Sequence, residues 1–143
     1  MKLFLDTSVV LAAIGSPDGA SREIFNQAEK QAWQLIVTPY VLSEIEANIC
    51  NFTDEAQSNW PNFRKNLIVQ KDILTIDRPA VFGPTKDRPI LFGALAWADV
   101  LLTLNQQDFG NLIDRTFYGL KVLRPGTFLL EERSCGRLPE QEN

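Results

Sequence analysis

Short apolar runs alternate with longer stretches of helical period along this chain. Runs of strand length occupy residues 3–5, 35–38, 73–76, 99–103 and 121–123. Between them lie amphipathic stretches, such as the one that carries Leu42, Ile45 and Ile49 on one helical face. Such alternation is typical of βαβ units. The pattern therefore predicts an α/β protein with a central, mainly parallel sheet of about five strands.

Turn and capping residues delimit the helical stretches. The pattern predicts helices over residues 9–14, 21–32, 39–49, 51–65 and 89–97. Pro39 suits the first turn of its helix, where the missing N–H would have no helical partner. Pro61 falls inside its helix and is expected to break or bend it. The chain is polar from residue 131, so we expect one domain over residues 1–130 and a disordered tail over residues 131–143.

The composition removes several kinds of catalytic site. The chain has no histidine, which excludes the Ser-His-Asp triad, the Cys-His pair and HExxH zinc sites. Its net charge of −4 argues against a broad basic surface for nucleic acid, although not against a nuclease whose divalent ions offset its acids. With 18 acidic residues, oxygen-ligated Mg²⁺ or Mn²⁺ is the natural cofactor for the remaining chemistry.

The apolar runs and the cysteines also indicate a compartment. No apolar stretch is long enough to span a bilayer, and the run that ends at Asp6 is too short for a signal peptide. Cys50 and Cys135 do not form a CxxC pair, so two free thiols are expected. We therefore expect a cytoplasmic protein that does not enter a membrane.

Three acids stand where a parallel sheet would gather functional side chains. Asp6 ends the first predicted strand, with the hydroxyls of Thr7 and Ser8 beside it, and Glu44 lies one turn into the helix after the second strand. Ligands bind beyond the carboxyl ends of parallel strands, so Asp6 and Glu44 are expected at the same edge. Asp87 precedes the helix at residues 89–97, and both Asp6 and Asp87 also suit the N-cap position.

Four more polar residues flank the fourth predicted strand. Asp99 precedes it at the amino end, which is the wrong edge for a shared site, so a structural role is expected. Thr103, Asn105 and Asp108 follow the strand at the correct edge, and Asp108 also suits a helix cap.

Two other classes of protein fit less well. A haloacid-dehalogenase phosphatase also opens with a strand ending in Asp, but it needs a second acid where this chain has Ser8. The glycine-rich loops GxGxxG and GxxxxGK[ST] are both absent from the sequence, which removes the standard nucleotide-binding motifs.

Four segments together resemble the motifs of the PIN-domain family. Residues 3–10 (LFLDTSVV) resemble its opening motif, and residues 38–45 (TPYVLSEI) resemble its second acidic motif. Residues 86–91 (KDRPIL) and 102–110 (LTLNQQDFG) are similar to the third and fourth. The four occur in order and at family-like spacing, over about residues 3 to 125.

The resemblance implies a Rossmann-like three-layer α/β/α sandwich and ribonuclease activity on single-stranded RNA with Mg²⁺ or Mn²⁺. Many relatives are toxins of bacterial toxin–antitoxin pairs of the VapC type, so an antitoxin partner and a homodimer are expected. Trp33 and Trp60, on otherwise polar predicted helices, add modest support for the dimer. Two divalent ions about 3.5–4 Å apart can activate water and stabilise both oxygens of the scissile phosphodiester.

Matched position by position, Asp6, Glu44 and Asp87 fall on the first three acids of the family, and Thr103 falls on the residue that supports the fourth. The departure is Asn105, where close relatives often have Asp, and Asp108 is expected to substitute. The expected catalytic acids are thus Asp6, Glu44, Asp87 and Asp108. The expected metal ligands are these four with Asn105, supported by Thr7, Ser8 and Thr103. The alternative is a non-catalytic PIN-like module that binds RNA or a protein.

Overall fold

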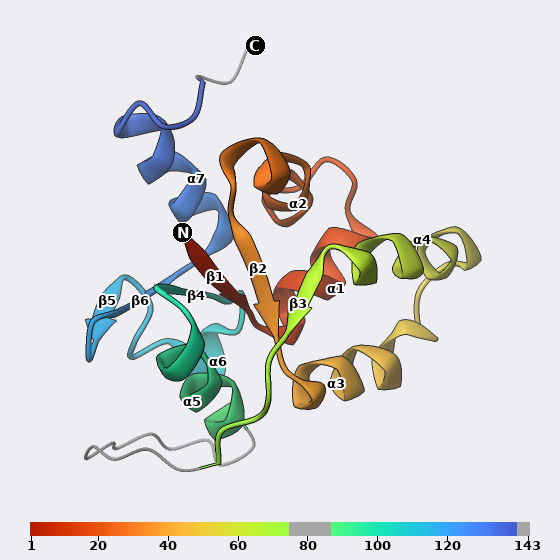
Figure 1. Cartoon of the computed structure of the whole chain (residues 1–143). Helices are drawn as coiled ribbons and strands as arrows, with labels where there is room; N and C mark the ends of the chain where they lie inside the picture. Colours follow the sequence, from red (N-terminus) through yellow and green to blue (C-terminus); the bar gives the residue numbers. More distant parts are fainter. Residues whose placement is uncertain (75–86, 140–143) are drawn as a thin grey trace.

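The computed structural model of the chain describes residues 1–74 and 87–139, and these form a sheet covered by helices (Figure 1). The strands are β1 (Lys2–Leu5), β2 (Gln34–Val37), β3 (Leu67–Val69), β4 (Val100–Leu102), β5 (Arg115–Phe117) and β6 (Leu120–Leu123). The helices are α1 (Thr7–Gly15), α2 (Ala20–Gln31), α3 (Pro39–Ile49), α4 (Asp54–Lys65), α5 (Arg88–Trp97), α6 (Gln106–Phe109) and α7 (Pro125–Ser134). This is the α/β class that the sequence predicts.

The sheet has six strands in the order β3-β2-β1-β4-β6-β5. All neighbouring pairs are parallel except β5 with β6. The turn between these two strands has positive φ at Tyr118 (48°) and Gly119 (83°), the backbone shape that suits a tight hairpin between right-twisted strands. From β1 the chain adds β2 and β3 on one side and then β4 on the other, so the order of the strands switches sides at β1. Ligands are therefore expected beyond the carboxyl ends of β1 and its neighbours.

Helices lie on both faces of the sheet and make it a sandwich of three layers. α1 packs against β1 and α2 against β2, whereas α5 packs against β1 and β4. Because crossovers are right-handed, the reversal at β1 puts α5 on the face opposite α1 and α2. The close approach of α5 depends on Gly93, since a Cβ there would lie 3.1 Å from the ring of Phe4.

The central strand is buried on both faces. Leu3, Phe4 and Leu5 are each 0% exposed. A strand covered on both sides reads as a continuous apolar run rather than an alternating one, and this is why the sequence locates β1 so clearly. Within the described residues, no helix combines the length and the apolar character that crossing a membrane requires. Cys50 and Cys135 are both exposed and free.

The third strand lies earlier than the sequence predicts. β3 is Leu67–Val69 and pairs with β2, whereas residues 73–74 are not in a strand and residues 75–76 lie outside the described part of the chain. Residues 67–69 and 73–76 both form apolar runs with strand character. The run that directly follows α4, residues 67–69, is the one that pairs with β2. The edge strand β5 was missed because its residues are exposed or half-buried and form no apolar run.

Pro61 does not break its helix, and Trp33 is not on the surface. α4 continues to Lys65 with Pro61 inside it; proline removes a single helical hydrogen bond, and Pro61 is exposed, where water can bind the carbonyl left over. Trp33 is 8% exposed and packs edge-on against Phe128, with their ring centroids 5.0 Å apart. It therefore belongs to the core and offers no surface for a dimer.

The polar stretch that begins at residue 131 is part of the folded domain, not a disordered tail, over its described residues. α7 runs to Ser134, and Glu132 and Leu138 are 2% and 4% exposed. The buried carboxylate of Glu132 accepts two hydrogen bonds from Arg137, at 2.6 and 2.9 Å. A polar side chain is buried here because it has a charged partner, which composition alone does not reveal.

Candidate functional site

Asp6 stands at the junction of β1 and α1 and is only 3% exposed. Its Oδ2 accepts hydrogen bonds from the Ser8 hydroxyl at 2.6 Å and from the Thr103 hydroxyl at 2.8 Å. Thr103 follows β4, the strand next to β1. The carboxylate is thus held at the carboxyl edge of the sheet by residues that follow two adjacent strands.

The same two hydroxyls are tied to the loop after β4. The backbone N–H of Leu104 donates to the Ser8 hydroxyl at 3.1 Å, and the N–H of Asn105 donates to the Thr103 hydroxyl at 3.0 Å. Each hydroxyl therefore accepts a bond from this loop while it donates one to Asp6. The predicted supporting residues Ser8 and Thr103 thus contact Asp6.

Glu44 is connected to the same place through the third predicted supporting residue. Its Oε1 accepts a hydrogen bond from the hydroxyl of Thr7 at 2.7 Å, and Thr7 directly follows Asp6. Glu44 is half-buried, whereas Glu46 on the same helix is exposed. The turn of α3 that carries Glu44 therefore faces the start of α1.

Asp87 precedes α5 and is 4% exposed. Both Asp6 and Asp87 occupy N-cap positions, but within the described residues neither side chain accepts a capping hydrogen bond from its helix. At Asp6, backbone hydrogen bonds at Thr7 and Ser8 offset only part of the effect of burial on the pKa of the carboxyl group. Burial is costly for an ionised carboxylate, so these positions are expected to serve another purpose.

The phenol of Tyr40 connects the acids electrostatically. Its pKa is raised first by burial and then by the negative charges of four carboxylates. These carboxylates belong to Glu44, Asp87, Asp6 and Asp72. All four charges act on the same phenol, and hydrogen bonds to Thr7 and to the backbone of Tyr40 connect Glu44 and Asp72 to the carboxyl edge of the sheet.

Asp72 was missed by the sequence analysis. Its Oδ2 accepts a hydrogen bond from the backbone N–H of Tyr40 at 3.2 Å, while its Oδ1 is buried and has no hydrogen-bond partner among the described residues. A third strand at residues 73–76 would put Asp72 at its amino end, the wrong edge for a shared site. With β3 at Leu67–Val69 it follows the carboxyl end, where the other acids are.

Asn105 and Asp108 bind each other. The Oδ1 of Asn105 accepts from the N–H of Asp108 at 3.1 Å, and its Nδ2 donates to Asp108 Oδ2 at 2.9 Å. Asn105 is therefore the N-cap of α6. The loop after β4 contacts the acidic site through the hydrogen bond that the backbone N–H of Asn105 donates to the Thr103 hydroxyl.

The charge balance of the site favours a cation. Burial raises the pKa of Asp6 above 3.8, and the hydrogen bonds from Ser8 and Thr103 only partly oppose this. Clustered carboxylates repel one another until a cation arrives, and carboxylate oxygens are the ligands that Mg²⁺ and Mn²⁺ prefer. In the described part of the chain, no three Asp, Glu or Cys side chains converge closely enough to enclose an ion as they stand. The donor chemistry fits a hard divalent ion, and binding would require the carboxylates to close around it.

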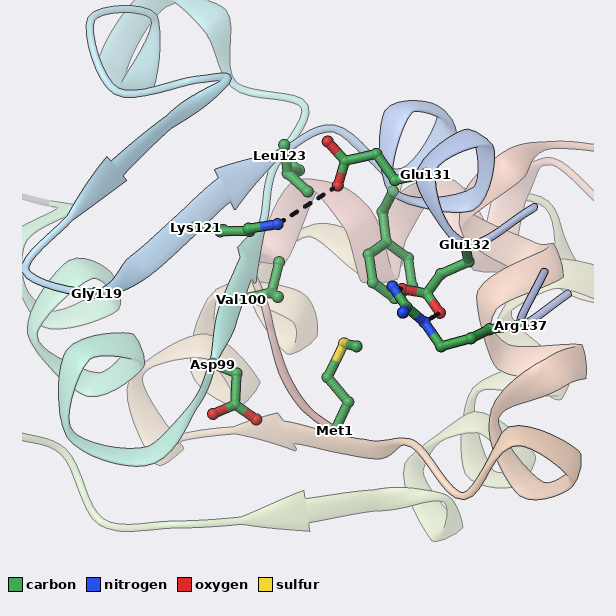
Figure 2. Close-up of a pocket in the computed structure, with 10 residues that line it drawn as sticks. Met1, Asp99, Val100, Gly119, Lys121, Leu123, Glu131, Glu132 and Arg137 are labelled. Carbon is green, nitrogen blue, oxygen red and sulfur yellow. Dashed lines mark hydrogen bonds and ion pairs between the residues drawn. The ribbon is translucent and has the colours of Figure 1, made fainter. Parts of the chain in front are cut away.

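Asp99 lies away from this cluster, as its position before β4 predicts. Its Oδ2 accepts from the backbone N–H of Lys2 at 2.9 Å, at the amino edge of the sheet. Figure 2 shows Asp99 beside a cavity of about 430 Å³ that Lys121 and Arg137 also line. Glu131 is 3.9 Å from Lys121 across this cavity.

A solved structure has the same architecture. A chain of the VapBC2 complex from Rickettsia felis, crystallised bound to a DNA fragment from its promoter, matches with a TM-score of 0.59. The match covers 85% of this chain and 97% of that chain, at 16% sequence identity. This chain has a PIN-like fold. No family model matches the sequence, and no curated protein does.

Proposed function

We propose that this protein is a metal-dependent endoribonuclease that hydrolyses single-stranded RNA. The observation that carries the proposal is the buried carboxylate of Asp6, which Ser8 and Thr103 hold at the carboxyl edge of the sheet and whose neighbour Thr7 binds Glu44. Buried acids that share one site need a compensating charge. In a hydrolase that uses divalent ions, the ions supply this compensating charge. The chain also has no histidine for other acid–base chemistry.

Asp6, Glu44 and Asp87 would hold Mg²⁺ or Mn²⁺. A bound ion neutralises phosphate charge and makes water a better nucleophile. The protein's own contribution is orientation, because Ser8 and Thr103 hold Asp6. Thr7 holds Glu44 in the same way. Hydroxyl donors that aim a carboxylate also favour its ionised form, which is the form that binds a cation.

A second ion is expected to bind more weakly. Its ligands would be Asn105 and Asp108, whose side chains form a hydrogen bond at 2.9 Å. A cation at Asp108 would have to replace the Nδ2 donor of Asn105, and the pair carries only one negative charge. We therefore expect one ion to bind measurably without RNA.

The partners follow from the structural likeness. The matching chain belongs to a complex named VapBC2, which supports an antitoxin-like protein partner and a toxin role for this chain. A homodimer remains a prediction. Sedimentation at high protein concentration would test it, and a monomer there would contradict it.

A non-catalytic PIN-like module that binds RNA or a protein is the second candidate. The mutual hydrogen bonds of Asn105 and Asp108 favour it, because they engage the expected fourth acid of the site in a helix cap. Such a module would keep the buried acids without turning over a substrate.

Cleavage of an unstructured RNA in Mg²⁺, in Mn²⁺ and in chelator tests the proposal. The matched variants are Asp6→Asn and Asp99→Asn, which make the same change at opposite edges of the sheet. We expect Asp6→Asn to abolish cleavage and Asp99→Asn to leave it unchanged. A folded wild-type protein that cleaves in neither metal would favour the non-catalytic module.

A further inference from the structure

Tyr40 combines exposure with a fixed position at the acidic site. It is the second residue of α3, which begins where β2 ends. Its side chain is half-buried, and it precedes Glu44 by four residues. Residues four apart share one face of a helix, so Tyr40 and Glu44 project on the same side of α3.

The backbone of Tyr40 is held from outside its helix. Its N–H donates to Asp72 Oδ2 at 3.2 Å. The neighbouring Lys71 accepts a hydrogen bond on its carbonyl from the indole N–H of Trp97 at 3.0 Å. Because Trp97 ends α5, the segment of Lys71 and Asp72 connects α3 to α5. The start of α3, and the ring that it carries, are thus braced between two helices of the site.

The surroundings of the ring select what it can contact. Glu44 lies one turn further along the same face of α3, and Asp72 accepts a hydrogen bond from the backbone N–H of Tyr40. Of the three parts of a nucleotide, the phosphate is repelled by these carboxylates unless a cation intervenes. The base is uncharged and has an aromatic face, so it can approach the ring without this repulsion. Stacking on aromatic side chains is the usual way in which proteins hold unpaired bases.

We propose, building on the function proposed above, that Tyr40 contacts the substrate by stacking its ring on an unpaired base next to the scissile bond. The braced start of α3 keeps the ring in place before RNA arrives, which reduces the cost of ordering it. Stacking tolerates any base, so Tyr40 contributes affinity and register rather than strict sequence choice.

Binding of a labelled single-stranded RNA, followed by fluorescence anisotropy, tests this contact without relying on cleavage. The parent is the Asp6→Asn variant in Mg²⁺, chosen so that bound RNA stays intact. Adding Tyr40→Phe keeps the ring and should change the Kd less than twofold. Adding Tyr40→Leu removes the aromatic face and should weaken binding about tenfold. The control is Tyr118→Leu, because Tyr118 is 47% exposed in the turn before β6, at the amino edge.

An RNA with one abasic nucleotide, moved along the strand, locates the stacked base. At one position of the abasic nucleotide, the parent should bind the abasic RNA about tenfold more weakly than it binds intact RNA. The Tyr40→Leu variant should bind the same abasic RNA and intact RNA equally well. Tyr40→Met repeats the test should Tyr40→Leu have a lowered melting temperature.

Three results would overturn the inference, and they differ in what else they affect. Equal affinity of the parent and the Tyr40→Leu variant for intact RNA would leave Tyr40 as a packing residue or as a contact for a protein partner. A loss in Tyr40→Leu that no abasic position reproduces would exclude stacking on a base. Both results leave the proposed ribonuclease intact if the wild type cleaves RNA. An absence of RNA binding and of cleavage in the wild type would overturn the proposed function together with this inference.

Discussion

The hydroxyl of Thr7 donates a hydrogen bond to Oε1 of Glu44 over 2.7 Å. The two residues lie on helices that follow different strands, α1 after β1 and α3 after β2. Since Thr7 is bonded in the chain to Asp6, this contact sets how Glu44 is aimed relative to the most buried acid of the site. It is a side-chain link between the helix that follows Asp6 and the helix that carries Glu44, and these two carboxylates are proposed to act together.

Thr7→Val should therefore separate activity from stability. Valine keeps the shape of threonine but cannot donate, so the free energy of unfolding is expected to fall by only about 1 kcal/mol. Cleavage is expected to fall about tenfold to a hundredfold, because Glu44 loses its orienting bond. Initial cleavage rates and urea unfolding measure the two effects, with Thr7→Ser as the control that keeps the hydroxyl. Full cleavage by the valine variant would show that Glu44 needs no such support.

Asp6→Asn should change how stability depends on pH in the absence of metal. Burial raises the pKa of Asp6 in the folded protein above 3.8, so the folded state binds this proton more tightly than the unfolded state does. Well below pH 3.8 the residue is neutral in both states and does not affect the free energy of unfolding. As the pH rises from 3.8 through the raised pKa, ionisation destabilises the folded protein, and above that pKa the loss is complete.

Urea unfolding in chelator at a series of pH values measures this dependence. The free energy of unfolding of Asp6→Asn should exceed that of the wild type by an amount that grows with pH and then levels off. A constant difference between Asp6→Asn and the wild type at every pH would contradict the expected cost of the buried charge.

Asn105→Asp should make the stability of the protein depend on metal. The substitution puts a second carboxylate where Asn105 Nδ2 now lies 2.9 Å from Asp108 Oδ2. Two like charges at this distance are expected to cost about 1 to 6 kcal/mol, between the limits of bulk water and of a typical protein surface, and Mn²⁺ should reverse the loss. Melting temperatures with chelator and with Mn²⁺ measure the effect. The control is Asn105→Ser, which keeps a capping oxygen and adds no charge; an equal response of both variants to Mn²⁺ would argue against a cation site here.

Leu138→Ala tests whether the chain after residue 131 belongs to the folded domain. Leu138 is 4% exposed, whereas Leu130 on α7 is 64% exposed. Truncation of a buried leucine is expected to lower the free energy of unfolding by about 2–5 kcal/mol, and the same change at Leu130 by less than about 0.5 kcal/mol. Chemical denaturation of the two variants decides between them. Equal and small effects would restore the domain end at residue 130.

The sequence by itself determined the class of the fold and two of its acids. A strand that is apolar at every position, as Leu3 to Leu5 are, has both faces covered, and this implies a parallel sheet between helices. Once the strands are parallel, their polarity puts Asp6 and Glu44 at one edge and Asp99 at the other. These inferences depend only on local pattern and on the direction of the chain.

Only the tertiary structure decided which of two apolar runs becomes the third strand. Residues 67–69 and 73–76 both have strand character, and the choice depends on which run can pair with β2 directly after α4. Because that choice sets which residue follows the strand, it also decided that Asp72 lies at the carboxyl edge, where it binds the backbone N–H of Tyr40.

Side-chain partnerships across the fold were likewise beyond local pattern. Glu132 is polar in sequence but buried in the structure, because Arg137 pairs with it. Trp33 lies on a polar stretch but packs on Phe128, nearly a hundred residues later. A residue's own chemistry sets what it needs, whereas the partner that meets the need is chosen by the packing of distant segments, and local periodicity carries no information about it.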